Sequence, residues 1–172
     1  MGRCPQDPNS LLHMDQVVRQ IFATMMGCEC VAVADAPGGD AKEKIFACVE
    51  FVQGCRYDCR IELGCEDADA LVRLLTGVVD ERLRADVAGE LCNMIAGRWI
   101  GRVEVADGPL ELMPPRTGVV GDLFEEDAAE CIVDGMYSFG SGCFRVRLNV
   151  REAWEGTKLG PAVDGELALQ DS

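Results

Sequence analysis

Hydrophobic residues recur at intervals of three and four positions in three stretches of the chain, the spacing of helices with one buried face. The first stretch covers residues 10–26. A shorter one covers residues 67–79, where Asp67 or Asp69 can cap the helix. The third, residues 80–102, is the longest uninterrupted helical pattern in the chain. The sequence therefore predicts two long helices and a shorter one.

Elsewhere, apolar and polar residues alternate, or short apolar runs are bounded by glycine-containing turns, as in strands. Strands are predicted at residues 28–35, 44–52, 57–65, 131–139 and 143–150, with short extended segments within residues 103–113 and 118–122. Turns around Gly54 and at residues 140–142 should join antiparallel neighbours. These elements predict an α+β fold in which two long helices cover one face of a curved, mainly antiparallel sheet of about six strands.

Length and composition are those of one domain with a sizeable core, because the chain has 172 residues of which 48% are hydrophobic. We assign this domain to residues 10–154. The first nine residues are rich in proline and polar side chains, and the last eighteen show little periodicity. Residues 1–9 and 155–172 are therefore predicted to be flexible termini.

The formal net charge of −14 argues against nucleic acid and membrane surfaces as partners, since their phosphates would be repelled and the chain has no basic run. The partner should be a protein or a small molecule. No stretch approaches eighteen consecutive apolar residues, and the N-terminus lacks a basic region followed by an apolar core. These features predict a cytoplasmic protein with neither a membrane-spanning helix nor a signal peptide.

Ten cysteines raise the alternatives of a metal site and of disulfide bonds. The sequence contains no Cys-x-x-Cys pair, and His13 is its only histidine. Most cysteines fall in predicted strands, so we interpret them as small core residues and His13 as a surface residue. A metal site formed by Cys55, Cys59 and Cys65 stays open as an alternative, as do disulfides.

The predicted helix at residues 80–102 carries a polar stripe beside an apolar one. At about 100° per residue, four residues fall within roughly 60° of one helix face: Asp86, Glu90, Asn93 and Gly97. The neighbouring apolar stripe, which is wide enough to pack on a sheet, contains Leu83, Val87, Leu91, Met94 and Ile95. The polar stripe should therefore be exposed but held rigidly.

This polar stripe is unfavourable for the helix itself. Asn is about 0.5 kcal/mol worse than Ala in a helix interior, and two acids four residues apart repel each other. A binding or catalytic role would explain the stripe, and an ordinary solvated helix face is the alternative.

Three sequence features occur together around this stripe. They are the spacing Asp86-x-x-x-Glu90-x-x-Asn93, the run Met94-Ile95-Ala96-Gly97 that continues it, and Pro114 and Pro115 about twenty residues later. The combination resembles the signature of the CheC/CheX family of chemotaxis phosphatases, which hydrolyse the aspartyl phosphate of the response regulator CheY. The resemblance extends from near Leu11 to near Glu152. The predicted helix at residues 10–26 has no Glu-x-x-Asn, whereas the CheC branch carries a second motif there, so the chain resembles CheX-type members.

The resemblance implies a function for these residues. Asn93 would orient the water that attacks the aspartyl phosphate, and Glu90 would pair with a lysine of the regulator. Supporting positions implied by the signature are Asp86, Gly97, Pro114 and Pro115. The resemblance implies no cofactor of the chain's own, because the regulator would supply Mg²⁺.

The resemblance also implies a homodimer, since CheX-type proteins join their sheets edge to edge, and the strand at residues 143–150 could form that edge. Two other functions remain open. One is a catalytically silent CheX-like module that binds a receiver domain or another signalling protein. The other is a relative of the flagellar switch. Both Glu90 and Asn93 are present, and this favours the phosphatase.

Overall fold

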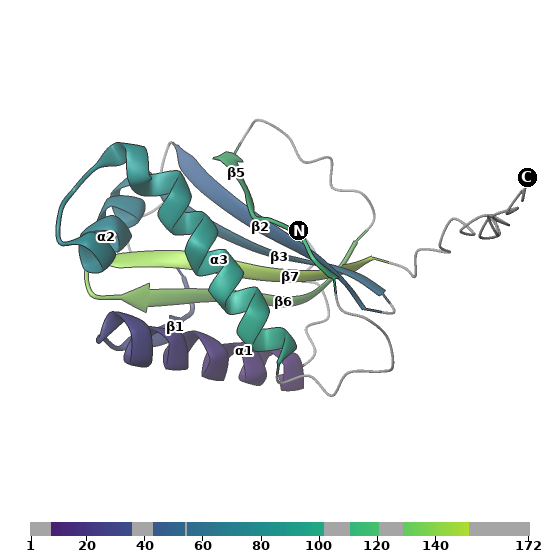
Figure 1. The fold of residues 1–172 in the computed structure, drawn as a ribbon. Coiled ribbons are helices and arrows are strands. Elements are labelled where there is room, and N and C mark those ends of the chain that lie inside the picture. The colour runs from purple at the N-terminus through teal and green to yellow at the C-terminus, as the bar shows by residue number, and fades with distance from the viewer. Residues whose placement is uncertain (1–7, 36–42, 54, 102–110, 121–128, 152–172) are drawn as a thin grey trace, which may run out of the picture.

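The computed structural model describes residues 8–35, 43–53, 55–101, 111–120 and 129–151. In these residues seven strands form one sheet (Figure 1). They are β1 (Cys30–Val33), β2 (Lys44–Gln53), β3 (Cys55–Gly64), β4 (Glu111–Leu112), β5 (Arg116–Val119), β6 (Glu130–Phe139) and β7 (Gly142–Arg151). Their order is β1-β6-β7-β3-β2-β4, with β5 also paired to β2, and each of these pairings is antiparallel. The predicted α+β fold with an antiparallel sheet is confirmed.

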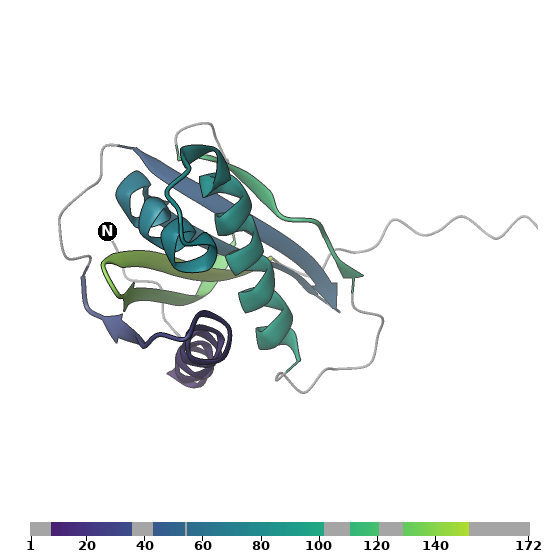
Figure 2. The ribbon, with the colours of Figure 1, turned by 60° about the vertical axis from the view of Figure 1, so that its left-hand side comes forward.

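Three α-helices cover one face of the sheet (Figures 1 and 2). The first, α1 (Pro8–Ile21), continues into a π-helical turn at Phe22–Met26. The short helix α2 (Cys65–Thr76) is separated from α3 (Arg84–Ile100) by a 3-10 turn at Glu81–Leu83. α1 and α3 lie over the strands, and α2 lies beside the beginning of α3. Two long helices on one face are what the sequence predicted.

The hydrophobic core lies between the sheet and these helices. Along β7, Phe144, Val146 and Leu148 are buried on the helix side, whereas Arg145 and Arg147 project from the other side. The largest fully buried side chains that the helices and the π-helical turn contribute are Met14, Val17, Ile21, Phe22, Leu71, Leu91 and Ile95. α1 and α3 are therefore anchored to the sheet by continuous apolar packing.

The opposite face of the sheet, which we call the open face, carries paired charges, and none of the described helices packs on it. Arg145 donates to the two carboxylate oxygens of Asp134 at 2.6 and 2.5 Å. Asn149 donates to Asp58 at 2.7 Å. Other ion pairs on this face join Arg60 and Arg147 to Glu62, and Arg56 and Arg116 to Glu50. Its charges therefore largely compensate one another across neighbouring strands.

The position of β7 contradicts the prediction that the strand at residues 143–150 is an edge. β7 lies between β6 and β3 and pairs with both. The edges are formed by β1 on one side and by β4 and β5 on the other. Strand order depends on pairings between distant segments, such as Ile61 of β3 with Val146 of β7, which local alternation cannot reveal.

The start of α2 also differs from the prediction, because neither of the two suggested aspartates is its N-cap. Gly64 is the N-cap, and the Asp67 carboxylate accepts a hydrogen bond from its backbone N–H at 3.3 Å. Asp69 instead binds Arg84 at the start of α3. Asp67 and Asp69 therefore stabilise the start of α2 and its contact with α3 from positions within α2.

His13 was predicted to lie at the surface, and this was wrong. Its side chain is half-buried, and its Nε2 atom is buried. α1 packs against α3, which brings the imidazole ring to 6.4 Å from the ring of Trp99, measured between centroids. His13 therefore belongs to the contact between the two long helices.

Candidate functional site

The candidate site is built on α3, whose buried side fixes its position on the sheet. Small residues face the strands directly, with Ala88, Gly89 and Cys92 all buried. The Cys92 thiol donates to the backbone oxygens of Cys59 at 3.2 Å and Ala47 at 3.5 Å. Larger side chains complete the contact, with Leu91, Ile95, Trp99 and Ile100 buried and Leu83, Val87 and Met94 half-buried at its margins. The predicted apolar stripe is therefore only partly the one that is buried, because small residues permit the closest approach.

Both ends of α3 are anchored to neighbouring elements. At its start, Arg84 donates to both carboxylate oxygens of Asp69 on α2, at 2.7 Å each. These hydrogen bonds outweigh the partial burial of Asp69 and lower the pKa of its carboxyl group. Near its other end, Trp99 contacts the rings of Phe51 and Tyr57, each at a centroid distance of 6.1 Å. A helix held in this way can present surface side chains with little movement.

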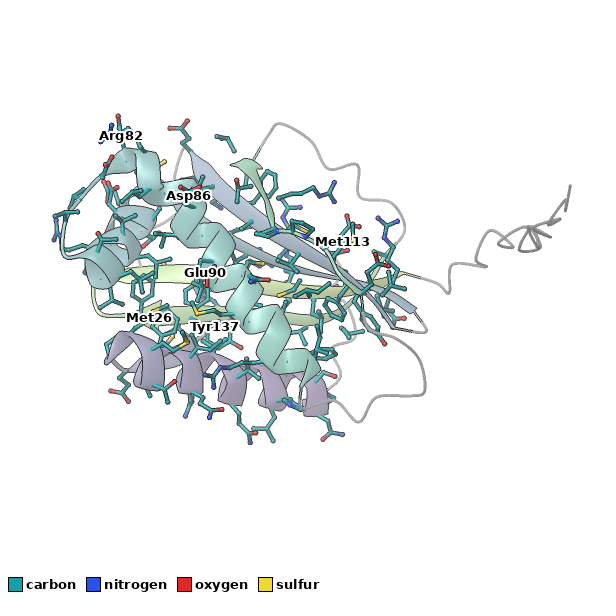
Figure 3. The ribbon with its side chains drawn as sticks, in the orientation of Figure 1. Met26, Arg82, Asp86, Glu90, Met113 and Tyr137 are labelled. Atoms are coloured by element: carbon teal, nitrogen blue, oxygen red, sulfur yellow. The ribbon has the colours of Figure 1, made fainter. Side chains whose placement is uncertain are left out.

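The predicted polar stripe lies on the outer side of α3. Asp86, Glu90 and Gly97 are exposed, and Asn93 is half-buried. Figure 3 shows Asp86 and Glu90 projecting from the same side of the helix, one turn apart. Within the described residues, the side chains of Asp86, Glu90 and Asn93 have no hydrogen bond or ion pair. The stripe is therefore available to a partner, and the Asn93 side chain is its most sheltered member.

Pro114 and Pro115 lie on the segment between β4 and β5. The Met113 N–H donates to the Glu50 backbone oxygen, and Arg116 pairs with Cys48. Two prolines thus stand opposite the single residue Val49, an arrangement that suits residues without an N–H to donate. The predicted break in regular pairing occurs at this point.

The proline segment touches α3 at Gly89, the residue before Glu90. A Cβ atom at Gly89 would lie 3.3 Å from Thr117 Cγ2 and 3.6 Å from Pro115 Cβ. Pro115 therefore lies against α3 at the residue before Glu90. Sequence reasoning did not identify Gly89 or Thr117, because their contact joins a helix to a strand that follows it by almost thirty residues. The only local signal was the adjacent small pair Ala88 and Gly89.

The site combines a carboxylate and a carboxamide at the spacing i, i+3 on one rigid helix. Glu90 can bind a cationic group, and the Asn93 amide can accept one hydrogen bond while it donates another. In the described residues, no group of three His, Cys, Asp or Glu side chains could hold a metal ion. The arrangement suits binding and orientation of groups that a partner brings.

The cysteines whose side chains the structure describes are free thiols. A hydrogen bond with Cys92 and burial both raise the pKa of Cys59, so this thiol stays protonated at neutral pH. Cys59 is fully buried and Cys65 lies at the start of α2. The side chain of Cys55 lies outside the described residues. Five of the described cysteines are buried, which agrees with their interpretation as small core residues.

None of the described helices combines the length and hydrophobicity that a membrane span requires. No protein-family model and no curated protein matches the chain. Solved structures do match it. CheX from Vibrio vulnificus superimposes with a TM-score of 0.63 at 13% identity, over 83% of this chain and 99% of that one.

Two further matches extend the comparison. A chain of the CheX–CheY–BeF3–Mg²⁺ complex from Borrelia burgdorferi gives a TM-score of 0.61 at 14% identity, over 84% of this chain and 97% of that one. FliY from Thermotoga maritima gives 0.51 at 11% identity, over 83% and 91%. The chain therefore has the fold of CheX and CheC-like chemotaxis proteins.

Proposed function

We propose that this chain is a CheX-type member of the CheC/CheX family and a phosphatase for the aspartyl phosphate of a CheY-type response regulator. The observation that carries the proposal is the pair Glu90 and Asn93, which lies at the family spacing on the outer side of an anchored helix. The shared fold supports it, and so does the position of Pro115 beside that helix.

Docking follows from the shape of the site. The polar stripe runs along α3, so the regulator would lie along the helix axis, with its phosphorylated aspartate facing Asn93. Glu90 is exposed and has no ion pair within the described residues, so it can pair with a regulator lysine near the phosphoryl group. This pair would hold the regulator in register. The contact should be modest in area, as is usual for transient signalling complexes.

Asn93 would act by orienting water. Hydrolysis requires a water molecule in line with the bond between the carboxyl group and phosphorus. The carboxamide oxygen of Asn93 can accept a hydrogen bond from that water, while its NH₂ group donates to a phosphoryl oxygen. Fixing the water in this geometry lowers the barrier without a general base. The half-buried position of Asn93 restricts its rotamers, which favours such a role.

The regulator would bring the remaining charges. Mg²⁺ bound to the regulator would neutralise charge on the phosphoryl oxygens, so this chain would need only to bind the regulator and to orient and admit one water. Because the regulator would supply these charges, a site made of one carboxylate and one carboxamide would be sufficient. A homodimer joined through a sheet edge stays our expectation, and β1 or β4 and β5 would have to supply the edge.

The test measures loss of phosphate from candidate phosphorylated regulators, with and without the protein. Asn93→Ala should keep the fold and the binding of a beryllofluoride-activated regulator, but lower the rate to near that of autodephosphorylation. Glu90→Gln should weaken binding, because it removes the charge that faces the lysine. Glu29→Gln is the matched control, since Glu29 is exposed just before β1, at the opposite sheet edge.

Wild-type turnover by Asn93→Ala would overturn the proposed mechanism. If the wild-type protein bound activated regulators without accelerating dephosphorylation, the silent binding module would replace the phosphatase.

A further inference from the structure

Gly97 is an exposed glycine in the interior of α3, and no contact with the described part of the chain requires a glycine there. Among the described residues, a Cβ atom at this position would meet nothing within 4 Å, and the Gly97 backbone has the ordinary right-handed helical conformation. Glycine inside a helix raises the unfolding equilibrium constant about fourfold to fivefold relative to alanine. Alanine would therefore fit and stabilise the free protein.

The other glycines of this region differ from Gly97. Gly89 faces the sheet edge, where a Cβ would press on Thr117 Cγ2 at 3.3 Å. Gly101 is the C-cap of α3, and a Cβ there would have only ordinary contacts with backbone oxygens, at 3.6 and 3.8 Å. Gly97 alone of the three is both inside the helix and directed to open space. A reason for glycine at this position must lie outside the described residues.

We propose that Gly97 is the point at which the main chain of the regulator packs directly against the backbone of α3. This inference rests on the proposed function and specifies how the partner is seated. Gly97 lies one helical turn beyond Asn93, which is about 6 Å along the helix axis. A partner segment over Gly97 would therefore belong to the loops that border its phosphorylated aspartate.

A missing side chain at this point permits close approach. Carbon atoms in contact lie about 3.5–4.0 Å apart, so a partner backbone that touches the Gly97 Cα leaves no room for a methyl group between them. Adding Cβ would lift the partner away from α3 on the side next to Asn93. The loss should therefore appear as weaker binding of the regulator.

The experiment titrates the beryllofluoride-activated regulator, identified by the phosphatase assay, into wild type and three variants. Gly97→Ala should lower the unfolding equilibrium constant about fourfold to fivefold in urea and yet raise the Kd for the regulator at least tenfold. Gly97→Ser, which gains less helix propensity, should raise the Kd equally. Gly101→Ala is the matched control, since it adds the same methyl group one turn further away, and its Kd should stay within twofold of wild type.

Wild-type affinity of Gly97→Ala and Gly97→Ser would overturn the inference, and so would an equal loss in Gly101→Ala. The two proposals fail in different ways. Wild-type turnover by Asn93→Ala contradicts the water-orienting mechanism, whereas wild-type affinity of Gly97→Ala beside an inactive Asn93→Ala contradicts only the backbone contact.

Discussion

One hydrogen bond joins α1 to β6 near the end of that strand, and its removal gives a sharp test of the structure. The Tyr137 side chain on β6 is fully buried, and its hydroxyl donates to Asp15 Oδ1 on α1 at 2.7 Å. Burial and the neighbouring carboxylate both raise the pKa of Tyr137, so the hydroxyl remains a donor. Asp15 is half-buried and can still reach water if the hydroxyl is removed.

The expected changes in the free energy of unfolding follow from the difference between the two partners, a buried hydroxyl and a half-buried carboxylate. Tyr137→Phe loses a hydrogen bond to a charged group, worth about 1.5–3 kcal/mol. Asp15→Ala loses the same bond and leaves a buried hydroxyl without an acceptor, but gains about 0.7 kcal/mol of helix propensity. In the Tyr137→Phe background no hydroxyl is left unsatisfied. There, Asp15→Ala should therefore stabilise the protein by up to about 0.7 kcal/mol, the reverse of its effect in wild type.

The assay is urea unfolding of the four proteins of this double-mutant cycle, followed by circular dichroism and fitted with a common m-value. The propensity gain cancels in the cycle, so the coupling free energy reports the hydrogen bond together with the cost of a hydroxyl left without an acceptor, and it should be at least about 1.5–3 kcal/mol. A coupling below about 0.5 kcal/mol, or the same destabilisation by Asp15→Ala in both backgrounds, would refute the reasoning.

Two other predictions concern contacts on either side of the sheet. Gly89→Ala should lower the rate of regulator dephosphorylation, because the added Cβ would press on Thr117 Cγ2. Thr117→Ser removes that methyl group and should restore the rate in the double variant. If the rate is not restored, this contact does not set the position of α3. Burial alone would raise the pKa of Asp134, but hydrogen bonds and charge from Arg145 outweigh it, so this pKa lies below its ordinary 3.8. The stability that Asp134 contributes is therefore complete above pH 3.8 and lost as the pH falls through its folded pKa. Arg145→Gln should reduce stability at pH 7 more than at about pH 2–3, and an equal loss at both pH values in urea titrations would contradict this assignment.

Local periodicity was sufficient to predict the helices and most strands. Alternation along β3 and β7 distinguished their two faces, because one face packs on helices while the other is charged. The same reasoning failed for sheet order. The strand at residues 143–150 was suggested as an edge, although β7 is central, because its pairing with β3, such as Val146 with Ile61, is set by tertiary packing rather than by either segment. His13 was misplaced for the same reason, since only the packing of α1 on α3 buries it.

The candidate site was predicted because its residues lie on one element. The positions of Asp86, Glu90 and Asn93 depend only on the helical repeat, so their common face could be derived from spacing. The sequence did not predict the contact of Pro115 and Thr117 with Gly89, which lies beside these residues. Pro115 approaches Gly89 because two prolines interrupt the pairing of β2 with β4 and β5. How closely the two segments approach depends on the small residues of α3, and the residues they pack against are distant in the sequence.

The pairing of β1 with β6, two strands that lie far apart in the sequence, has a consequence during synthesis. β1 pairs only with β6 among the described strands, and its residue Cys30 meets Phe139, which emerges from the ribosome 109 residues later. At about 5–20 residues per second, the apolar side of α1 would wait roughly 5–20 s for the strands that cover it. Met14, Val17 and Ile21, which are fully buried in the folded chain, would lack the cover of β6 during that interval. The N-terminal helix is therefore the segment of the nascent chain for which a holding chaperone would compete.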